Sequence, residues 1–143
     1  MPFRIPQILL EELVKRNKIS PDLIEGLQNQ VITENENLET LLLKNNLISE
    51  DELFATKTEV YGLPIVKITE IEINKEVSKE FAIDVIEFYK IIPFAKEGDL
   101  LKVGILNPED IDALEALKFI AANKNLQIER YLIIQKDFPS LFS

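Results

Sequence analysis

The sequence contains no cysteine and no histidine, and these two absences exclude several kinds of chemistry. The chain has no disulfides, no zinc ligand set of the usual kind, no cysteine nucleophile and no histidine general base. Glycine is scarce too, and the four glycines form neither a GxxxxGK[ST] nor a GxGxxG run that would cradle a nucleotide phosphate. We therefore expect no catalytic residues in this chain.

Basic side chains are outnumbered by acidic ones. The chain has 16 lysines and arginines against 25 aspartates and glutamates, a net charge of -9 that is spread over both halves. No basic stripe is present to contact phosphates, so neither nucleic acid nor an anionic membrane surface is an expected partner. The sequence shows no signal-peptide pattern and no apolar run near the about 18 residues that span a bilayer. We expect a cytoplasmic protein without direct membrane insertion.

An internal repeat organises the first part of the chain. Leu9–Gln30 lies over Leu38–Glu59 at a shift of 29 positions, with seven identities. The identical positions are Leu9/Leu38, Leu13/Leu42, Lys15/Lys44, Asn17/Asn46, Ile19/Ile48, Ser20/Ser49 and Asp22/Asp51. Each copy predicts a helix, a tight turn and a second helix.

Leucine-rich stripes and capping signals mark the helices of the repeat. The first helix is expected to run to about Lys18, and Ser20 and Ser49 are expected to cap the second helix of each copy. Pro21 fits the first position of its helix, and Gly62 stops the last one. The apolar positions that we assign to the core are Leu9, Leu10, Leu13, Val14, Leu23, Ile24, Leu27, Val31, Leu38, Leu41, Leu42, Leu43, Leu53, Phe54 and Val60.

A strand hairpin is the clearest feature of the second part. The apolar runs Tyr89–Ala95 and Asp99–Leu106 are joined by a short turn in which Gly98 takes positive φ. Pro93 cannot donate a ladder hydrogen bond, so its strand is expected at a sheet edge or with a bulge. Gly104 would let another backbone come close.

The other elements complete a mixed fold. They are strands at Leu63–Ile68 and Leu126–Ile133, a helix from Asn74, a helix from Asn107 to Asn123, and the start of another helix at Lys136. Their expected buried positions are Val77, Phe81, Val85, Ile86, Ile111, Leu114, Leu117 and Ala121. We therefore predict an α+β protein of two lobes, a tandem-repeat helical lobe over 1–62 and an α/β lobe over 63–143.

Two groups of carboxylates could be taken for metal sites. They are Glu50, Asp51 and Glu52 in one group and Glu109, Asp110 and Asp112 in the other. Both groups lie at expected helix starts, where acidic side chains complement the helix dipole. A hard cation needs about six or more oxygen ligands from a shaped loop. We interpret both groups as helix starts and predict no metal site.

The two turns of the repeat admit two interpretations. Asn17 and Asn46 tolerate positive φ, and the helix N-termini that follow could each receive one phosphate of a ligand with two. The simpler interpretation, which we favour, is that each asparagine ends one helix before the next begins.

Several motifs together resemble a known family. The tandem LxxxLxxxNxIS pattern is followed by YGLPIV at 61–66, YKIIPF at 89–94, LKVGI at 101–105 and Asn107-Pro108. This order resembles the N-terminal domain of type IV pilus assembly and type II secretion ATPases, the MshEN or type II secretion E N-terminal-like domain. The likeness covers nearly the whole chain.

The resemblance implies a non-catalytic regulatory and docking module. In these ATPases the domain precedes the motor domains, which carry the Walker motifs, and contacts cytoplasmic parts of the membrane platform. Its expected partners are the cytoplasmic domains of inner-membrane platform proteins of a pilus or secretion system and the motor domains of its own parent ATPase. The domain would be peripheral to the inner membrane through these partners.

The resemblance also implies an alternative function as a cyclic di-GMP sensor. Some family members bind this ligand through a tandem motif with Arg-Leu-Gly, a central Gly, and Leu and Gln in the second helix. In this chain the two Arg positions hold Ile8 and Asn37, and the two Leu-Gly pairs are replaced by Leu9-Leu10 and Leu38-Glu39. The two central glycines are replaced by Asn17 and Asn46. The motif is thus degenerate, and Glu39 adds negative charge where a phosphate should approach. If the dinucleotide binds, the expected residues are Leu9, Leu13, Asn17, Gln30, Leu38, Leu42 and Asn46.

Overall fold

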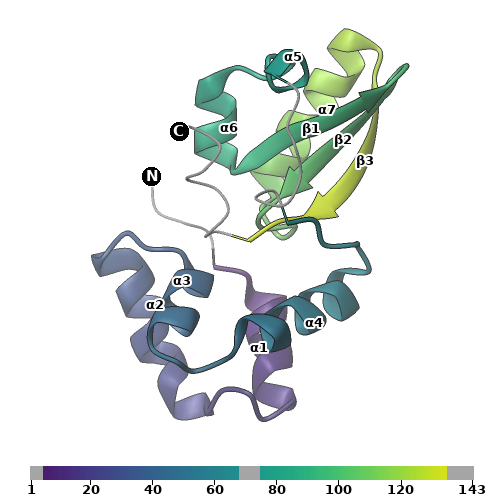
Figure 1. Cartoon of the computed structure of the whole chain (residues 1–143). Coiled ribbons are helices and arrows are strands. Elements are labelled where there is room, and N and C mark those ends of the chain that lie inside the picture. Colours follow the sequence, from purple (N-terminus) through teal and green to yellow (C-terminus); the bar gives the residue numbers. More distant parts are fainter. Residues whose placement is uncertain (1–4, 68–74, 135–143) are drawn as a thin grey trace. The chain divides into compact units, whose positions relative to one another are not determined.

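The structure, a computed structural model, describes residues 5–67 and 75–134 and divides into two compact units, 1–62 and 63–143 (Figure 1). The first unit is helical, and the second combines helices with a three-stranded sheet. Each unit has a hydrophobic cluster of its own. The α+β fold class is therefore confirmed.

The helices of unit 1 interlock the two copies of the repeat. They are α1 (Gln7–Lys15), the short 3-10 helix η1 (Pro21–Leu23), α2 (Ile24–Thr33), α3 (Leu38–Lys44) and α4 (Glu50–Tyr61). Helix α1 packs against α4, and α2 packs against α3. The first helix of each copy thus contacts the second helix of the other copy, and the copies share one core.

The core of unit 1 is built from the predicted stripes. Its buried members are Leu9, Leu10, Leu13, Ile19, Leu27, Val31, Leu38, Leu41, Leu42, Ile48 and Leu53. The prediction is wrong at Leu23, which is 41% exposed because it closes η1 instead of lying within α2. Ser20 also makes no side-chain cap, whereas Ser49 does, and Gly62 ends α4 with φ 64 as expected.

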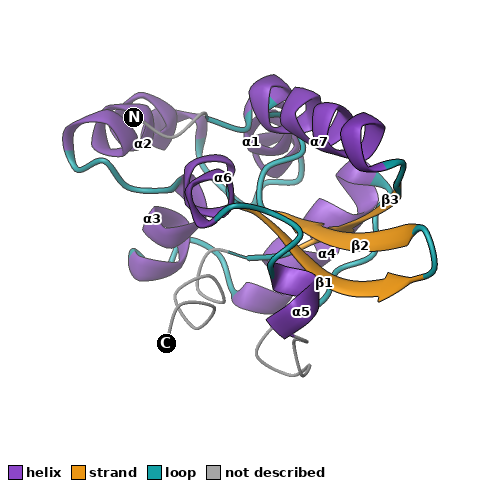
Figure 2. Cartoon of the chain, turned by 90° about the horizontal axis from the view of Figure 1, so that it is seen from above, coloured by secondary structure: helices purple, strands orange, loops and turns teal. Residues whose placement is uncertain are grey.

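Unit 2 is built around a mixed sheet. Its elements are α5 (Lys75–Ser78), α6 (Ile83–Tyr89), β1 (Ile91–Glu97), β2 (Leu100–Ile105), α7 (Ile111–Lys124) and β3 (Gln127–Leu132). The strand order is β1-β2-β3, as the single sheet in Figure 2 shows, with β1 antiparallel and β3 parallel to β2. Helix α7 makes the crossover that a parallel pair requires.

The predicted hairpin is confirmed, but its first strand is displaced along the chain: Tyr89 ends α6 instead of starting the strand, and Lys96 and Glu97 pair within β1 instead of forming the turn. Gly98 has φ 60 in the turn, and β1 is an edge strand with a register shift between Pro93 and Ala95. Gly104 is also a site of close approach, but to a side chain instead of a backbone. A β-carbon on Gly104 would lie 2.5 Å from Cγ2 of Ile133.

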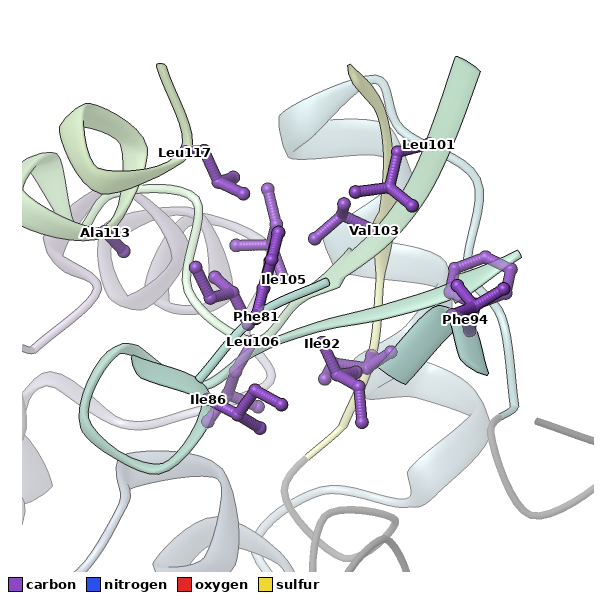
Figure 3. Close-up of a cluster of buried hydrophobic side chains, with 13 residues drawn as sticks. Phe81, Ile86, Ile92, Phe94, Leu101, Val103, Ile105, Leu106, Ala113 and Leu117 are labelled. Carbon is purple, nitrogen blue, oxygen red and sulfur yellow. The ribbon is translucent and has the colours of Figure 1, made fainter. Parts of the chain in front are cut away.

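The core of unit 2 has members on both faces of the sheet, because β1 pairs Ile91 with Ile105 and the next residue, Ile92, with Gly104. Val103 and Ile105 of β2 are fully buried, and α7 places Ala113 and Leu117 over them (Figure 3). The cluster continues through Phe81, Ile86, Ile92, Phe94, Leu101 and Leu106.

Two predicted elements of unit 2 are shorter than expected. Among the described residues of the predicted strand Leu63–Ile68, only Ile65 pairs, in a single bridge to Leu132, where Pro64 and Val66 bond to the backbone N–H and C=O of Leu132. The predicted helix from Asn74 is two helices, α5 and α6. The carbonyl that would continue it, that of Glu80, accepts a 2.7 Å hydrogen bond from Lys124, and Ala82 is extended. Ile68 and Asn74 lie outside the described residues, as does the predicted helix start at Lys136.

Helix α7 begins later than predicted. The side chain of Asn107 accepts from Glu109 N–H at 2.9 Å in a local turn, and Asp110 is the residue that caps the helix. The prediction of a buried Ile111 is wrong, because this residue is 59% exposed in the first turn of α7, while Ala113 is buried. The helix ends two residues after Asn123, at Asn125 with φ 54.

Candidate functional site

The two turns of the repeat have the same backbone geometry. Asn17 and Asn46 have φ of 58° and 56°. After α1, Lys18 N–H donates to Leu13 O at 2.9 Å, and after α3, Leu47 N–H donates to Leu42 O at 2.9 Å. This is the pattern by which a left-handed residue satisfies the last carbonyls of a helix. The same pattern explains why α1 ends at Lys15 and not at Lys18.

The helix starts that follow the two turns differ. Ser49 accepts from Glu52 N–H at 3.2 Å, which caps the helix, and its hydroxyl donates to the carboxylate of Glu52 at 3.1 Å. Ser20 makes no such bond, and Pro21 removes one N–H from the start of η1. An anion would thus meet an acidic, capped N-terminus at the second turn and a 3-10 turn at the first.

Cations at the first turn are bound to carboxylates of α4. Arg16 bonds Glu12 at 3.0 Å and also Glu59, and these hydrogen bonds, that of Glu59 first, raise the pKa of Arg16. Lys18 lies 2.7 Å from Glu52 and lowers the pKa of that carboxyl group. The equivalent positions in the second copy, Asn45 and Leu47, carry no charge. The charges of the first turn therefore connect α1 to α4.

The seven residues predicted for a dinucleotide fall into two groups. Leu9, Leu13, Leu38 and Leu42 are at most 1% exposed and belong to one core cluster. The polar residues Asn17 and Asn46 are exposed, and Gln30 is half-buried in α2. The leucines thus form the framework of the unit, and only the three polar residues present accessible side-chain surface.

The most unusual polar contact of unit 1 is a buried ion pair that the sequence interpretation missed. The ammonium group of Lys57 on α4 donates to the carboxylate of Glu39 on α3, and the two side chains are only 1% and 5% exposed. Asn37 caps α3 by accepting from Glu39 N–H at 2.8 Å. The sequence signal for the burial of Lys57 is that this residue follows the core residue Leu53 by one helical turn, on the same face of the helix. The negative charge of Glu39 is therefore compensated within the protein.

The acidic groups of unit 2 stabilise local structure. Asp110 accepts from Ala113 N–H at 3.2 Å at the start of α7. Among the residues that the structure describes, no three or more acidic side chains are placed to share a metal ion.

Within the same residues, no helix combines the length and apolarity that crossing a bilayer requires.

Solved structures with similar folds place this architecture among known domains. A structure of MshE with cdg has a TM-score of 0.69 at 19% identity and covers 94% of this chain and 95% of that one. A structure of the N-terminal domain of XpsE has a TM-score of 0.66 at 21% identity, with 99% and 96% covered. At these identities the likeness shows the fold.

Sequence comparison gives the family. The type IV pilus assembly ATPase PilB of Myxococcus xanthus (strain DK1622) is 26% identical over 110 residues, which are 77% of this chain and 19% of PilB. The chain thus spans about a fifth of the length of this relative. The family model of the MshEN domain matches residues 61–141, a range that begins at the YGLPIV motif. The predicted family is confirmed, and the chain belongs to the MshEN domain family.

Proposed function

We propose that this chain is a non-catalytic domain of a longer pilus or secretion ATPase, and that unit 1 docks the motor to the cytoplasmic part of its membrane platform. The observation that carries the proposal is the similarity to the pilus assembly ATPase PilB over 77% of the chain. In this role the domain is cytoplasmic, and the motor domains of the parent ATPase are its other partners.

Unit 1 offers surface for such a contact. Among its described residues, the exposed large apolar side chains are Ile8, Leu23 and Ile32, at 58%, 41% and 65% exposure. Exposed apolar side chains near polar ones are typical of protein interfaces, in which aliphatic and aromatic anchors supply most of the affinity.

A truncation in the parent motor tests the docking role. Removal of 1–62 is expected to abolish binding to the platform protein, measured by biolayer interferometry, while ATP hydrolysis by the motor persists. Ile32→Glu in the intact motor is expected to weaken binding, with Ile111→Glu on unit 2 as the matched control at similar exposure. Unchanged platform binding after the truncation would remove the docking role from unit 1.

The second candidate function is that of a cyclic di-GMP sensor that controls the motor. The observation that favours it is the shared fold with the MshE structure that contains cdg, taken as cyclic di-GMP. The buried pairing of Glu39 with Lys57 also lessens the repulsion that a phosphate would meet.

Calorimetry distinguishes the two functions. Titration of the chain with cyclic di-GMP is expected to give no heat of binding if the domain only docks, and a dissociation constant near about 1 µM, or about -8 kcal/mol, if it is a sensor. The double variant Asn17→Gly/Asn46→Gly restores the glycines of the motif. It is expected to bind more tightly than the parent chain only if the site is a degenerate sensor.

A further inference from the structure

The two edges of the sheet in unit 2 differ in how their backbone groups are protected. On β1, Pro93 has no N–H to offer, and the bulge between Pro93 and Ala95 interrupts the ladder. Proline and bulges at an edge prevent pairing with another strand. The strand β3, at the other edge, has neither device (Figure 1).

The free side of β3 already accepts an extended segment at one end. Leu132 N–H donates to Pro64 O at 2.8 Å, and Leu132 O accepts from Val66 N–H at 2.9 Å. Gln127 N–H, by contrast, donates to Asp99 O at 2.8 Å in the loop that precedes β2. Backbone groups alternate in direction along a strand, so those of Ile128 and Arg130 point to the same side as those of Leu132.

These two residues leave the edge open. Within the described ranges, no backbone hydrogen bond reaches Ile128 or Arg130 from the side away from β2. The register pairs Leu101 with Ile128 and Val103 with Arg130, so both side chains lie on one face of the sheet. Ile128 is half-buried and Arg130 is exposed. The edge thus presents an apolar position and a cation, two residues apart.

We propose that the edge of β3 at Ile128–Arg130 is a docking site for an extended segment of a partner protein, which adds a strand to the sheet. The segment carries an acidic side chain beside Arg130 and an apolar side chain beside Ile128. Charge complementarity selects an acidic segment, because Arg130 is exposed and forms no ion pair with another described residue. The site is in unit 2 and is independent of the docking role proposed for unit 1.

A designed peptide probes the edge directly. The probe is the blocked heptapeptide TVTETVT, whose valines flank the glutamate by two residues on either side and so fit a parallel or an antiparallel strand. It is titrated into the uniformly ¹⁵N-labelled full chain. The expected result is saturable shifts that are largest at the amides of Ile128 and Arg130. The absence of shifts up to about 1 mM peptide, the range of the weakest specific binding, would overturn the proposal.

Two variants separate pairing of the backbone from recognition of charge. Arg130→Pro removes an N–H that makes no bond within the sheet, so the fold is retained and affinity is expected to fall about tenfold. Arg130→Glu keeps the backbone and is expected to reverse the preference to the peptide TVTKTVT. Equal affinity of all three proteins for TVTETVT would contradict the proposal. So would a dimer, seen by sedimentation, that Arg130→Pro abolishes, because the occupant would then be a second copy.

Discussion

Lys57 and Glu39 form a charged contact inside a core of leucines. Removing one partner of a buried pair leaves the other charge buried without a partner, which lowers the stability of the fold. Replacing both partners with apolar groups leaves no unpaired charge. The pair also joins α3 to α4, the two helices of the second copy, in which Leu42 and Leu53 are fully buried.

The energetic role of this pair can be measured by urea unfolding. Lys57→Met is expected to lower the free energy of unfolding by about 3–5 kcal/mol, and Glu39→Leu/Lys57→Met is expected to recover most of that loss. Lys18→Met is the control, because its pair with Glu52 is exposed and contributes at most about 1 kcal/mol. A double variant no more stable than Lys57→Met would show that packing, and not the stranded charge, causes the loss.

Gly104 and Gly26 give opposite expectations for the same substitution. Gly104→Ala is expected to destabilise by about 1–3 kcal/mol, because the new methyl group overlaps the side chain of Ile133. Gly26→Ala in α2 meets nothing within 4 Å and is expected to stabilise by about 0.5–1 kcal/mol. Thermal unfolding of the two variants tests both signs, and a stabilising Gly104→Ala would mean that Ile133 moves away at little cost.

At the scale of single elements, the sequence predicted whether a segment is a helix or a strand better than it predicted the residues at which the segment begins and ends. The apolar stripes identified α1 to α4, the hairpin and β3, because each buries one face of a regular period. The ends depended on side chains that could bond in more than one way. Asn107 made a local turn where a cap was expected, and Asp110 three residues later took that role. At the break between α5 and α6, Glu80 accepts from Lys124, a partner 44 residues away that no local pattern connects to it.

Glu80, which lies between α5 and α6, accepts hydrogen bonds from Lys124 of α7 and Lys96 of β1. These bonds make the stability of unit 2 sensitive to pH. Burial by itself would raise the pKa of Glu80, but hydrogen bonds from Lys124 and Lys96, at 3.3 and 3.4 Å, outweigh it and lower the pKa. A lowered folded-state pKa contributes stability above the ordinary value of 4.5, and this contribution is lost as the pH falls through the folded-state value.

Glu80→Gln should therefore lower stability more near neutral pH than in acid. The gap in free energy of unfolding between the parent chain and Glu80→Gln is expected to shrink as the pH is lowered from about 7 to about 3. Urea unfolding at both pH values measures it. Glu97→Gln is the control, since Glu97 is 72% exposed and lies 3.9 Å from Lys102. A gap that is the same at both pH values would contradict the ionic role of Glu80.

At the scale of the whole molecule, the family could be predicted from short motifs but the candidate site could not. The motifs YGLPIV, YKIIPF and LKVGI lie within or at the start of the matched range 61–141, where they specify turns and strands of unit 2. The residues predicted for a dinucleotide lie in the repeat, before that range. Lys57 was missed because a lysine in an amphipathic helix is normally exposed.

The two units are predicted to be separate folding domains. Each has its own buried cluster, so 1–62 and 63–143 are expected to fold when produced alone. The shorter fragment is expected to be the less stable, because a small domain buries a smaller share of its surface. Circular dichroism during thermal unfolding tests both fragments. A fragment 63–143 without a cooperative transition would show that its fold requires unit 1.

The pairing of α1 with α4 also determines when unit 1 can form during synthesis. The buried leucines of α1 have their main packing partner in the last helix of the unit, which ends at Tyr61. A ribosome that adds about 5–20 residues per second makes the roughly 45 residues between these helix ends in about 2–9 seconds. During that interval the apolar side of α1 has no α4 to cover it, and a chaperone at the ribosomal exit could bind this side before α4 is made.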